Sequence, residues 1–186
     1  MAYLYMVMLG CRPPGRLTEQ HDIFFGIGET MADLIPGIKT FWPEAKGKIH
    51  VDAWRQVRLV NGHAISLQPI GTNTARGKER LYFINLGGYK QGEFDEYHYK
   101  MLTVAPDISL AIKASKQTAF YKHVGFQGAV SHVDDKYGVD VDEWVEVKEA
   151  LSEADKNRYE LLIQKAEKKV EEDALHIGYF KLTSFF

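Results

Sequence analysis

The chain has 186 residues, of which 45% are hydrophobic and 12% aromatic, and this composition excludes general disorder. With 23 basic and 25 acidic residues the formal net charge is -2, so the chain has no overall field to attract nucleic acid or an anionic membrane, and we expect neither partner. A single cysteine, Cys11, excludes an intrachain disulfide and favours a cytoplasmic location.

The first half of the chain predicts the element order β-β-α-β-β. Its helix is indicated by apolar residues that recur at helical spacing from residue 29 onwards, and Pro36-Gly37 should kink or split it. Asn61-Gly62 is a strong signal for a type I′ hairpin. In chain order the predicted elements are a strand over 3–9, a loop over 10–18, a strand over 21–27, the helix, an extended segment over 49–60 and a strand over 63–67.

The second half predicts the same order after a linker over 69–79, which is rich in turn-forming residues. Asp107 is a suitable N-cap for its helix. We therefore expect a first repeat over 1–68 and a second over 80–186. The second consists of strands over 81–86 and 97–104, a helix to about 121, an inserted loop over about 122–139, a strand over 141–147, a long helix over 152–175 and a strand over 179–182.

The two halves resemble each other residue by residue. When residues 4–27 are laid on 81–104 without a gap, seven of the 24 positions are identical, where unrelated sequences share about one or two. The segment 51–57 matches 141–147 in the same way. The sequence therefore predicts an α+β fold that duplicates a β-β-α-β(β) unit, with mainly antiparallel sheet, helices packed on it, and halves related by a pseudo-two-fold axis.

The shared motifs also resemble a known family. The motifs L-Y-x-x-x-L-G, E-x-H and V-D-x-W occur in this order in residues 4–57 and again in residues 81–147. This order resembles the bacterial domain of unknown function 1543 family. The resemblance implies two tandem copies and a cytosolic bacterial setting. It implies no catalytic residue, because the family has no assigned activity.

The Glu-x-His pairs are the first candidate site. Glu19 with His21, and Glu96 with His98, stand two residues apart at the start of a strand, so each pair shares one face of a sheet. The pairs could perform acid-base chemistry or bind a divalent transition metal. They could equally be hairpin architecture, because a buried Glu can accept hydrogen bonds from loop amides and a His can bond to a backbone carbonyl.

A second, weaker candidate for a metal site is acidic. Alternation along a strand places His50 and Asp52 on one face, and Asp140 and Asp142 take the matching positions in the second half. Such residues can hold a cation, but acids that face water beside a packed Trp are the simpler interpretation. We therefore expect no bound cofactor.

The third candidate lies where the halves differ. The loop after the first strand carries Cys11, Arg12 and Arg16, whereas the corresponding loop of the second half carries Tyr89 and is followed by Tyr97. Two unlike loops on similar scaffolds can form one asymmetric pocket, in which the arginines would meet a carboxylate or phosphate. Cys11 beside His21 could be a nucleophile, although a single thiol after a strand is more often a small core residue.

No common catalytic motif supports an enzyme class. The chain lacks a dinucleotide fingerprint, a phosphate loop, a serine-hydrolase elbow and a Cys-x-x-Cys pair. We therefore expect an uncharacterised binding or interaction module that holds a small molecule or a protein between the unlike loops. The alternative is a small enzyme that uses the Glu-x-His pairs, with or without a divalent metal. Exposed aromatic residues near the end of the sequence also suit a homodimer.

Overall fold

The computed structural model describes residues 1–72, 77–90, 94–123, 131–132, 139–166 and 171–186. The chain divides into two compact units. Unit 1 consists of residues 1–76 together with 150–186, and unit 2 consists of residues 77–149. The chain therefore leaves unit 1, builds unit 2 and returns to unit 1. None of the helices within the described residues is long and apolar enough to cross a membrane.

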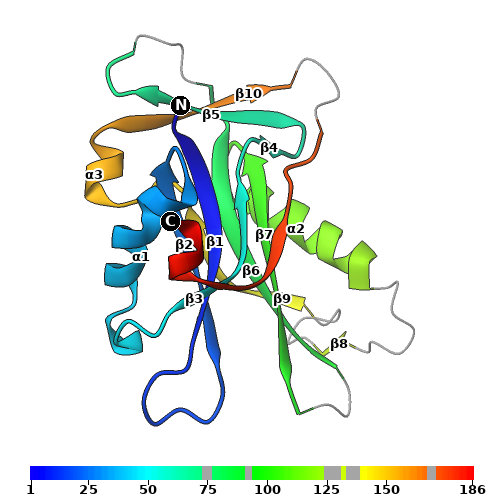
Figure 1. The fold of residues 1–186 in the computed structure, drawn as a ribbon. Helices are drawn as coiled ribbons and strands as arrows, with labels where there is room; N and C mark the ends of the chain where they lie inside the picture. The colour runs from blue at the N-terminus through cyan, green and yellow to red at the C-terminus, as the bar shows by residue number, and fades with distance from the viewer. Residues whose placement is uncertain (73–76, 91–93, 124–130, 133–138, 167–170) are drawn as a thin grey trace. The chain divides into compact units, whose positions relative to one another are not determined.

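Unit 1 contains two antiparallel sheets, one with strand order β11-β3-β1-β2 and one with strand order β10-β5-β4. Helix α1 packs against β2 (Figure 1). The elements of unit 1 are β1 Tyr3–Cys11, β2 Gln20–Gly28, η1 Met31–Leu34, α1 Ile35–Phe41, η2 Pro43–Ala45, β3 His50–Gln56, β4 Leu59–Val60, β5 His63–Pro69, α3 Glu153–Lys156, β10 Tyr159–Lys165, β11 His176–Lys181 and η3 Leu182–Phe185.

The core of unit 1 lies under β1, which is buried along most of its length. The inward residues of β1 pack against the apolar faces of η1, α1 and β3, and Trp54 and Phe180 close the edge of the cluster. The fully or nearly buried members are Tyr5, Val7, Leu9, Cys11, Met31, Leu34, Ile35, Ile38, Ala45, Ile49, Val51 and Leu182. Full burial of side chains of this size stabilises a fold by about 1.5 to 3 kcal/mol each.

Two local predictions for unit 1, the interrupted helix and the Asn61-Gly62 hairpin, are confirmed, and the structure adds a cap by Asp33 that we did not predict. The helical segment is split, but the break falls between Leu34 and Ile35, because Pro36 is tolerated in the first turn of α1. The side chain of Asp33 accepts hydrogen bonds from the backbone N–H groups of Glu29 and Thr30 and so fixes the start of η1. The hairpin between β4 and β5 turns at Asn61 and Gly62, both at positive φ, as a type I′ turn requires.

Unit 2 contains one antiparallel sheet in which β6 is central and is paired with β7, β8 and β9. Helix α2 packs on this sheet (Figure 1) and buries Ala111 against Ile84 and Leu86. Asp107 caps the helix as predicted, because its carboxylate accepts the N–H of Leu110 at 2.9 Å. The elements are β6 Arg80–Lys90, β7 Glu96–Ala105, α2 Ile108–His123, β8 Ser131–His132 and β9 Val139–Glu146.

The predicted long helix over 152–175 is wrong. Ser152 does cap a helix, but α3 ends at Lys156, and β10 follows and pairs with β5 along seven residues. The apolar run from Tyr159 to Ile163 is short enough to suit a helix or a strand, and the free edge of β5 decides in favour of a strand. Residues 150–186, which we assigned to the second repeat, pack in unit 1. The final strand is confirmed as β11.

The returning segment is fixed to unit 1 by a buried carboxylate. Asp173 is 8% exposed and accepts the backbone N–H groups of Arg58 and Leu59 at 2.9 and 3.1 Å. The side chain of Arg58 adds an ion pair at 3.4 Å. These contacts satisfy the backbone between β3 and β4 and hold the segment that leads into β11.

Candidate functional site

Equivalent strand positions carry the Glu-x-His pairs in both units. In unit 1, Gly10 of β1 lies opposite His21 of β2 on one side and His50 of β3 on the other. In unit 2, Gly87 of β6 lies opposite His98 of β7 and Asp140 of β9. A β-bulge interrupts the pairing with the third strand between residues 8 and 9 in unit 1 and between residues 85 and 86 in unit 2.

The glycine at this position leaves room for polar side chains above the sheet. A Cβ atom added at Gly10 would coincide with the side chains of His50 and Asp52, and one at Gly87 would coincide with the carboxylate of Asp142. Only a residue without a side chain therefore lets the neighbouring strands direct their polar groups over the central strand. The presence of glycine at this position in both units therefore has a steric cause.

Four side chains of unit 1 converge over Gly10, and we call Glu19, His21, His50 and Asp52 the unit 1 cluster. Nε2 of His50 lies 3.2 Å from Oε1 of Glu19 and 3.2 Å from Oδ1 of Asp52. Nε2 of His21 lies 3.3 Å from Oδ2 of Asp52 and 3.9 Å from Oε2 of Glu19. The two candidate pairs that the sequence suggested separately, Glu19 with His21 and His50 with Asp52, form one group.

The inner half of the unit 1 cluster is buried and incompletely bonded. The side chain of His50 is 9% exposed and that of Asp52 is 19% exposed. Within the part of the chain that the structure describes, His50 Nε2 and Asp52 Oδ2 are buried atoms without a hydrogen bond, although Glu19 Oε1 and His21 Nε2 lie 3.2 and 3.3 Å from them, respectively. Buried polar atoms are normally hydrogen-bonded, so this pair is an exception that requires a physical explanation.

The outer half of the unit 1 cluster is open. Glu19 precedes β2 and its side chain is 46% exposed, while that of His21 is 39% exposed. The ring of Tyr179, from β11, packs on the ring of His50 with centroids 4.3 Å apart. Four residues after His50 on β3, the ring of His176 stacks on Trp54 with centroids 3.8 Å apart. The cluster is thus accessible from the side of Glu19 and His21.

Unit 2 has a smaller and more exposed group made of Glu96, His98 and Asp142, which we call the unit 2 cluster. Nδ1 of His98 lies 3.1 Å from Oδ2 of Asp142, and Nε2 lies 3.9 Å from Oε2 of Glu96. Asn85 adds a contact of 3.2 Å to Nδ1 of His98, while its own Oδ1 is buried without a partner. The three potential ligand atoms all lie within 4.8 Å of one another. Those of unit 1 are spread more widely.

The remaining predicted site residues are distributed over both units. Cys11 is a buried core residue. Burial raises the pKa of its thiol, and the negative charge of Glu19 acts in the same direction, so the structure gives it the environment of an unreactive cysteine. Arg12 and Arg16 are exposed in the loop after β1. The backbone of Tyr89 pairs with that of Glu96, and Tyr97 is 45% exposed.

Since Cys11, Arg12 and Arg16 belong to unit 1 and Tyr89 and Tyr97 to unit 2, a ligand site between the unlike loops stays a prediction. Asp140 lies on β9 opposite Gly87. Its side chain is outside the described residues, as are those of the inserted loop, including residues 133–138.

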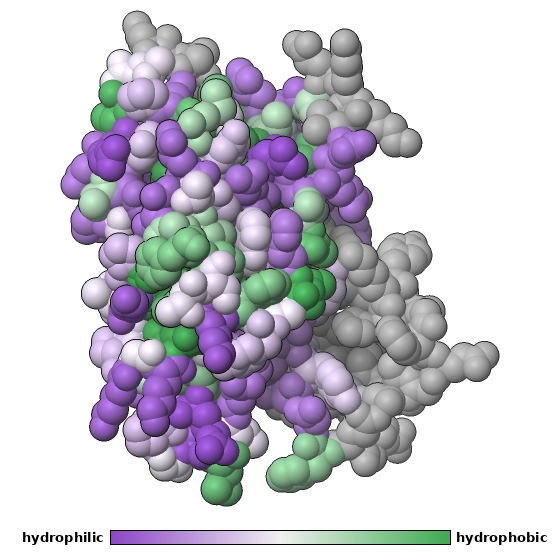
Figure 2. Space-filling model, viewed as in Figure 1, coloured by the Kyte–Doolittle hydropathy of each residue, from purple (hydrophilic) through white to green (hydrophobic). Residues whose placement is uncertain are grey.

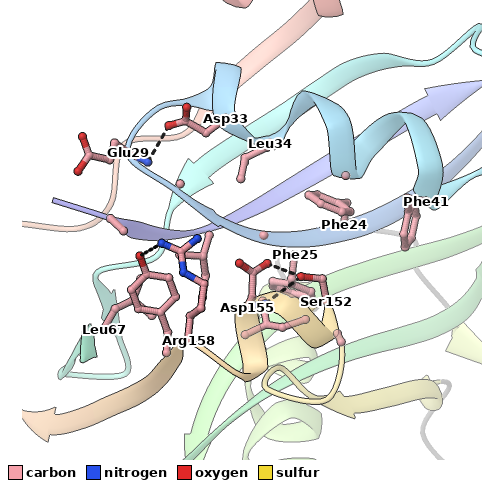
Figure 3. Close-up of a pocket in the computed structure, with 18 of the residues that line it drawn as sticks. Phe24, Phe25, Glu29, Asp33, Leu34, Phe41, Leu67, Ser152, Asp155 and Arg158 are labelled. Carbon is pink, nitrogen blue, oxygen red and sulfur yellow. Dashed lines mark hydrogen bonds between the residues drawn. The ribbon is translucent and has the colours of Figure 1, made fainter. Parts of the chain in front are cut away.

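A separate cleft of about 900 Å³ lies in unit 1 along β2. In Figure 3, Phe24, Leu34 and Phe41 approach it from one side, and Ser152, Asp155 and Arg158 approach from the other. The acids of the cleft are already engaged, Asp33 with the start of η1 and Asp155 with the hydroxyl of Ser152 at 2.8 Å. No residue of the unit 1 cluster lines this cleft. The sequence did not predict the cleft, because the residues on its two sides are more than a hundred positions apart in the chain.

Comparisons with known proteins agree with the fold and leave the function open. The crystal structure of a protein Il1583 from Idiomarina loihiensis is similar over 98% of this chain and 99% of that one, with a TM-score of 0.63 and 23% sequence identity. This likeness concerns the fold. No curated protein matches the chain. Residues 16–67 match the family described as Domain of Unknown Function, DUF1543, and the match covers one segment, not the two tandem copies that we expected. The part of the chain that is similar to this family runs from just before β2 into β5 and includes the whole unit 1 cluster, and the family description assigns no function.

Proposed function

We propose that the unit 1 cluster binds a divalent transition metal ion, of which Zn²⁺ is the best example, and that the protein is a small metal-dependent enzyme. The observation that carries the proposal is the pair of buried atoms His50 Nε2 and Asp52 Oδ2, which have ion-pair neighbours but no hydrogen bond within the described residues. An ion above Gly10 would coordinate both atoms. Imidazole and carboxylate are also the ligand types that zinc prefers beside thiolate.

The spacing of the donor atoms supports the proposal. In a tetrahedral zinc site with bonds of about 2.0 Å, neighbouring ligand atoms lie about 3.3 Å apart. Of the four histidine-to-carboxylate separations in the unit 1 cluster, three, at 3.2, 3.2 and 3.3 Å, are close to this value, with a different oxygen of each carboxylate facing each histidine. The fourth, 3.9 Å between Glu19 and His21, involves the two most exposed side chains, which can close on an ion by rotation. A single ion would have to draw these more widely spread atoms together.

The exposure of the cluster supports catalysis over a purely structural role. Structural zinc sites are closed, whereas catalytic sites keep a position for water or substrate. His50 and Asp52 lie at the bottom, and the side of Glu19 and His21 faces solvent. A metal ion lowers the pKa of a bound water towards 7 and so makes a hydroxide available at neutral pH. Glu19, which can move, is suited either to bind the ion or to accept the proton of that water.

The proposal extends to the unit 2 cluster as a second and weaker cation site. Its support is the mutual approach of Glu96, His98 and Asp142 within 4.8 Å. Because all three side chains are at least 32% exposed, hydration competes with the ion for each of them.

We also propose that the two units derive from one duplicated β-β-α-β unit and keep a pseudo-two-fold relation. The constant offset of 77 residues, between Gly10 and Gly87 and between the two bulges, supports the duplication.

The setting and partners of the protein belong to the same proposal. The buried free thiol of Cys11 suits a reducing, cytoplasmic environment, and the resemblance of the motifs suits a bacterial source. A homodimer, or a protein or small-molecule partner, is proposed on the exposed apolar side chains near the C-terminus. Leu175, Tyr179 and Phe186 are at least 64% exposed, and Figure 2 shows apolar side chains over this part of unit 1.

Metal binding by the full chain tests the proposal directly. We expect about one equivalent of Co²⁺ to bind tightly to the metal-free protein and to give the visible absorption of a low-coordinate cobalt site, and Zn²⁺ to displace it. His50→Ala and Asp52→Asn should remove this absorption. The matched control is His63→Ala, because His63 lies in the same unit but outside the cluster and contacts the carbonyl of Asn61. Binding that is equally tight in His50→Ala would exclude the site, and metal-free acid-base chemistry by His21 would then be the alternative.

A further inference from the structure

The unit 1 cluster has an aromatic wall that the motifs do not account for. Tyr179 comes from β11, more than a hundred residues after the cluster in sequence, and packs on the imidazole of His50 with centroids 4.3 Å apart and planes 32° apart. The ring of Tyr179 is nevertheless 67% exposed, so burial of an apolar side chain does not explain its position.

A β-bulge places Tyr179 there. β11 pairs with β3 at Ile177 opposite Ala53 and at Phe180 opposite Val51, so Gly178 and Tyr179 together lie opposite Asp52. Gly178 has a φ of 147°, which side chains rarely tolerate. An extra residue in one strand redirects the side chains around it, and such bulges are common beside functional sites. Here the bulge directs a ring onto His50.

On the basis of the proposed metal site, we infer that Tyr179 is a positioning residue for His50. The ring fixes the plane of the imidazole, so that Nε2 stays directed at Asp52 Oδ1 and Glu19 Oε1, 3.2 Å from each. It also covers the face of His50 and thereby leaves the side of Glu19 and His21 as the approach for water or substrate. Outer residues that orient a metal ligand typically contribute about 10 to 100-fold to metal affinity.

The experiment compares Co²⁺ binding and the visible spectrum of the cobalt-loaded full chain in four variants and the original protein. Tyr179→Phe keeps the ring and should bind within about twofold of the original. Tyr179→Ala should bind about tenfold more weakly and show a shifted, broader cobalt band, because the imidazole is no longer fixed. Gly178→Ala should behave like Tyr179→Ala although it retains the tyrosine, because a side chain at this φ is strained and disturbs the bulge.

Ile177→Ala is the matched control on the same strand. Ile177 is 74% exposed and lies opposite Ala53, outside the cluster, so affinity and spectrum should not change. Thermal unfolding of each variant shows that it is folded at the temperature of the measurement. If Tyr179→Ala retains the affinity and the spectrum of the original protein, the role of Tyr179 is refuted while the metal site stands. If the original protein binds no Co²⁺, both the site and the role of Tyr179 are refuted.

Discussion

Unit 1 and unit 2 place related groups of side chains at the same strand positions but shelter them to different degrees. In unit 1, His50 is 9% exposed, lacks a hydrogen-bond partner at Nε2 and is covered by Tyr179. In unit 2, His98, Glu96 and Asp142 are all at least 32% exposed, and Asn85 takes the place that corresponds to Met8. The comparison teaches that a repeated motif fixes where polar groups meet, whereas the surrounding strands decide how deeply those groups are buried.

The largest predicted effect is the loss of Co²⁺ affinity when His50 of unit 1 is removed. Removal of a direct ligand should exceed the roughly 10 to 100-fold effect of its outer partners, so Co²⁺ binding by His50→Ala should weaken by more than about a hundredfold. Isothermal titration calorimetry measures this affinity. His63→Ala should bind as the original protein does. Equal weakening in both variants would mean that the effect does not come from the cluster.

Alanine at the central glycine should destabilise unit 1 more than unit 2. The added Cβ at Gly10 meets His50 and Asp52, which are enclosed, whereas that at Gly87 meets only Asp142, which is exposed and can turn away. Overpacking of an enclosed site costs about 1 to 3 kcal/mol. Urea unfolding of Gly10→Ala and Gly87→Ala gives the two free energies of unfolding. A larger loss for Gly87→Ala would contradict the difference in enclosure.

The unit 2 cluster should contribute a second, weaker class of cation binding. His98→Ala and Asp142→Asn should remove that class and leave the tight class intact, because the tight ligands all belong to unit 1. Titration with Mn²⁺, followed by its electron paramagnetic resonance signal, detects weak sites rich in oxygen ligands. Loss of the tight class in Asp142→Asn would show that the two clusters are not independent.

The start of the helical segment after β2 in unit 1 should depend on pH. The N–H of Thr30 holds the pKa of Asp33 below its usual value, against a smaller effect of desolvation and with help from Glu29. The stabilisation is therefore complete above the unfolded pKa of about 4 and is lost as the pH falls through the lower folded-state pKa. Asp33→Ala should lower the melting temperature at pH 6 but not at the lowest pH at which the protein folds. Glu44→Ala, on an exposed residue, should have no effect at either pH.

The smallest effect is expected at Cys11, the last residue of β1, which corresponds to Gly88 of β6. The thiol is buried and its pKa is raised, so it should stay protonated at neutral pH and react with a thiol reagent only as fast as the protein opens. Thr18→Cys places a thiol on the exposed loop and should be labelled at once. Comparable labelling rates at the two positions would restore Cys11 as a nucleophile candidate.

The sequence predicted the strands and turns well because their signals are local. The apolar runs of β1 and β6, the Asn61-Gly62 turn and the Asp107 cap each depend on a few adjacent residues. The segment 159–163 was assigned to a helix because its apolar residues fit two periodicities, and only the distant strand β5 distinguishes them. The Glu-x-His and His-x-Asp patterns were visible, but their convergence depends on the register of β2 and β3 with β1. The strand that contains Tyr179 was predicted, but its pairing with the distant β3 and the bulge opposite Asp52 carried no local signal.

The route of the chain determines when unit 1 can be completed. Residues 77–149 interrupt it, and β10, β11 and Asp173 come after the interruption. During synthesis from the N-terminus, β3 is therefore available long before the strand that covers it, and unit 2 can fold while β3 still has an unpaired edge. The aromatic wall over His50 can form only after residues 77–149 have been made, so a shortened or stalled chain that ends before residue 176 would carry all four side chains of the unit 1 cluster without Tyr179.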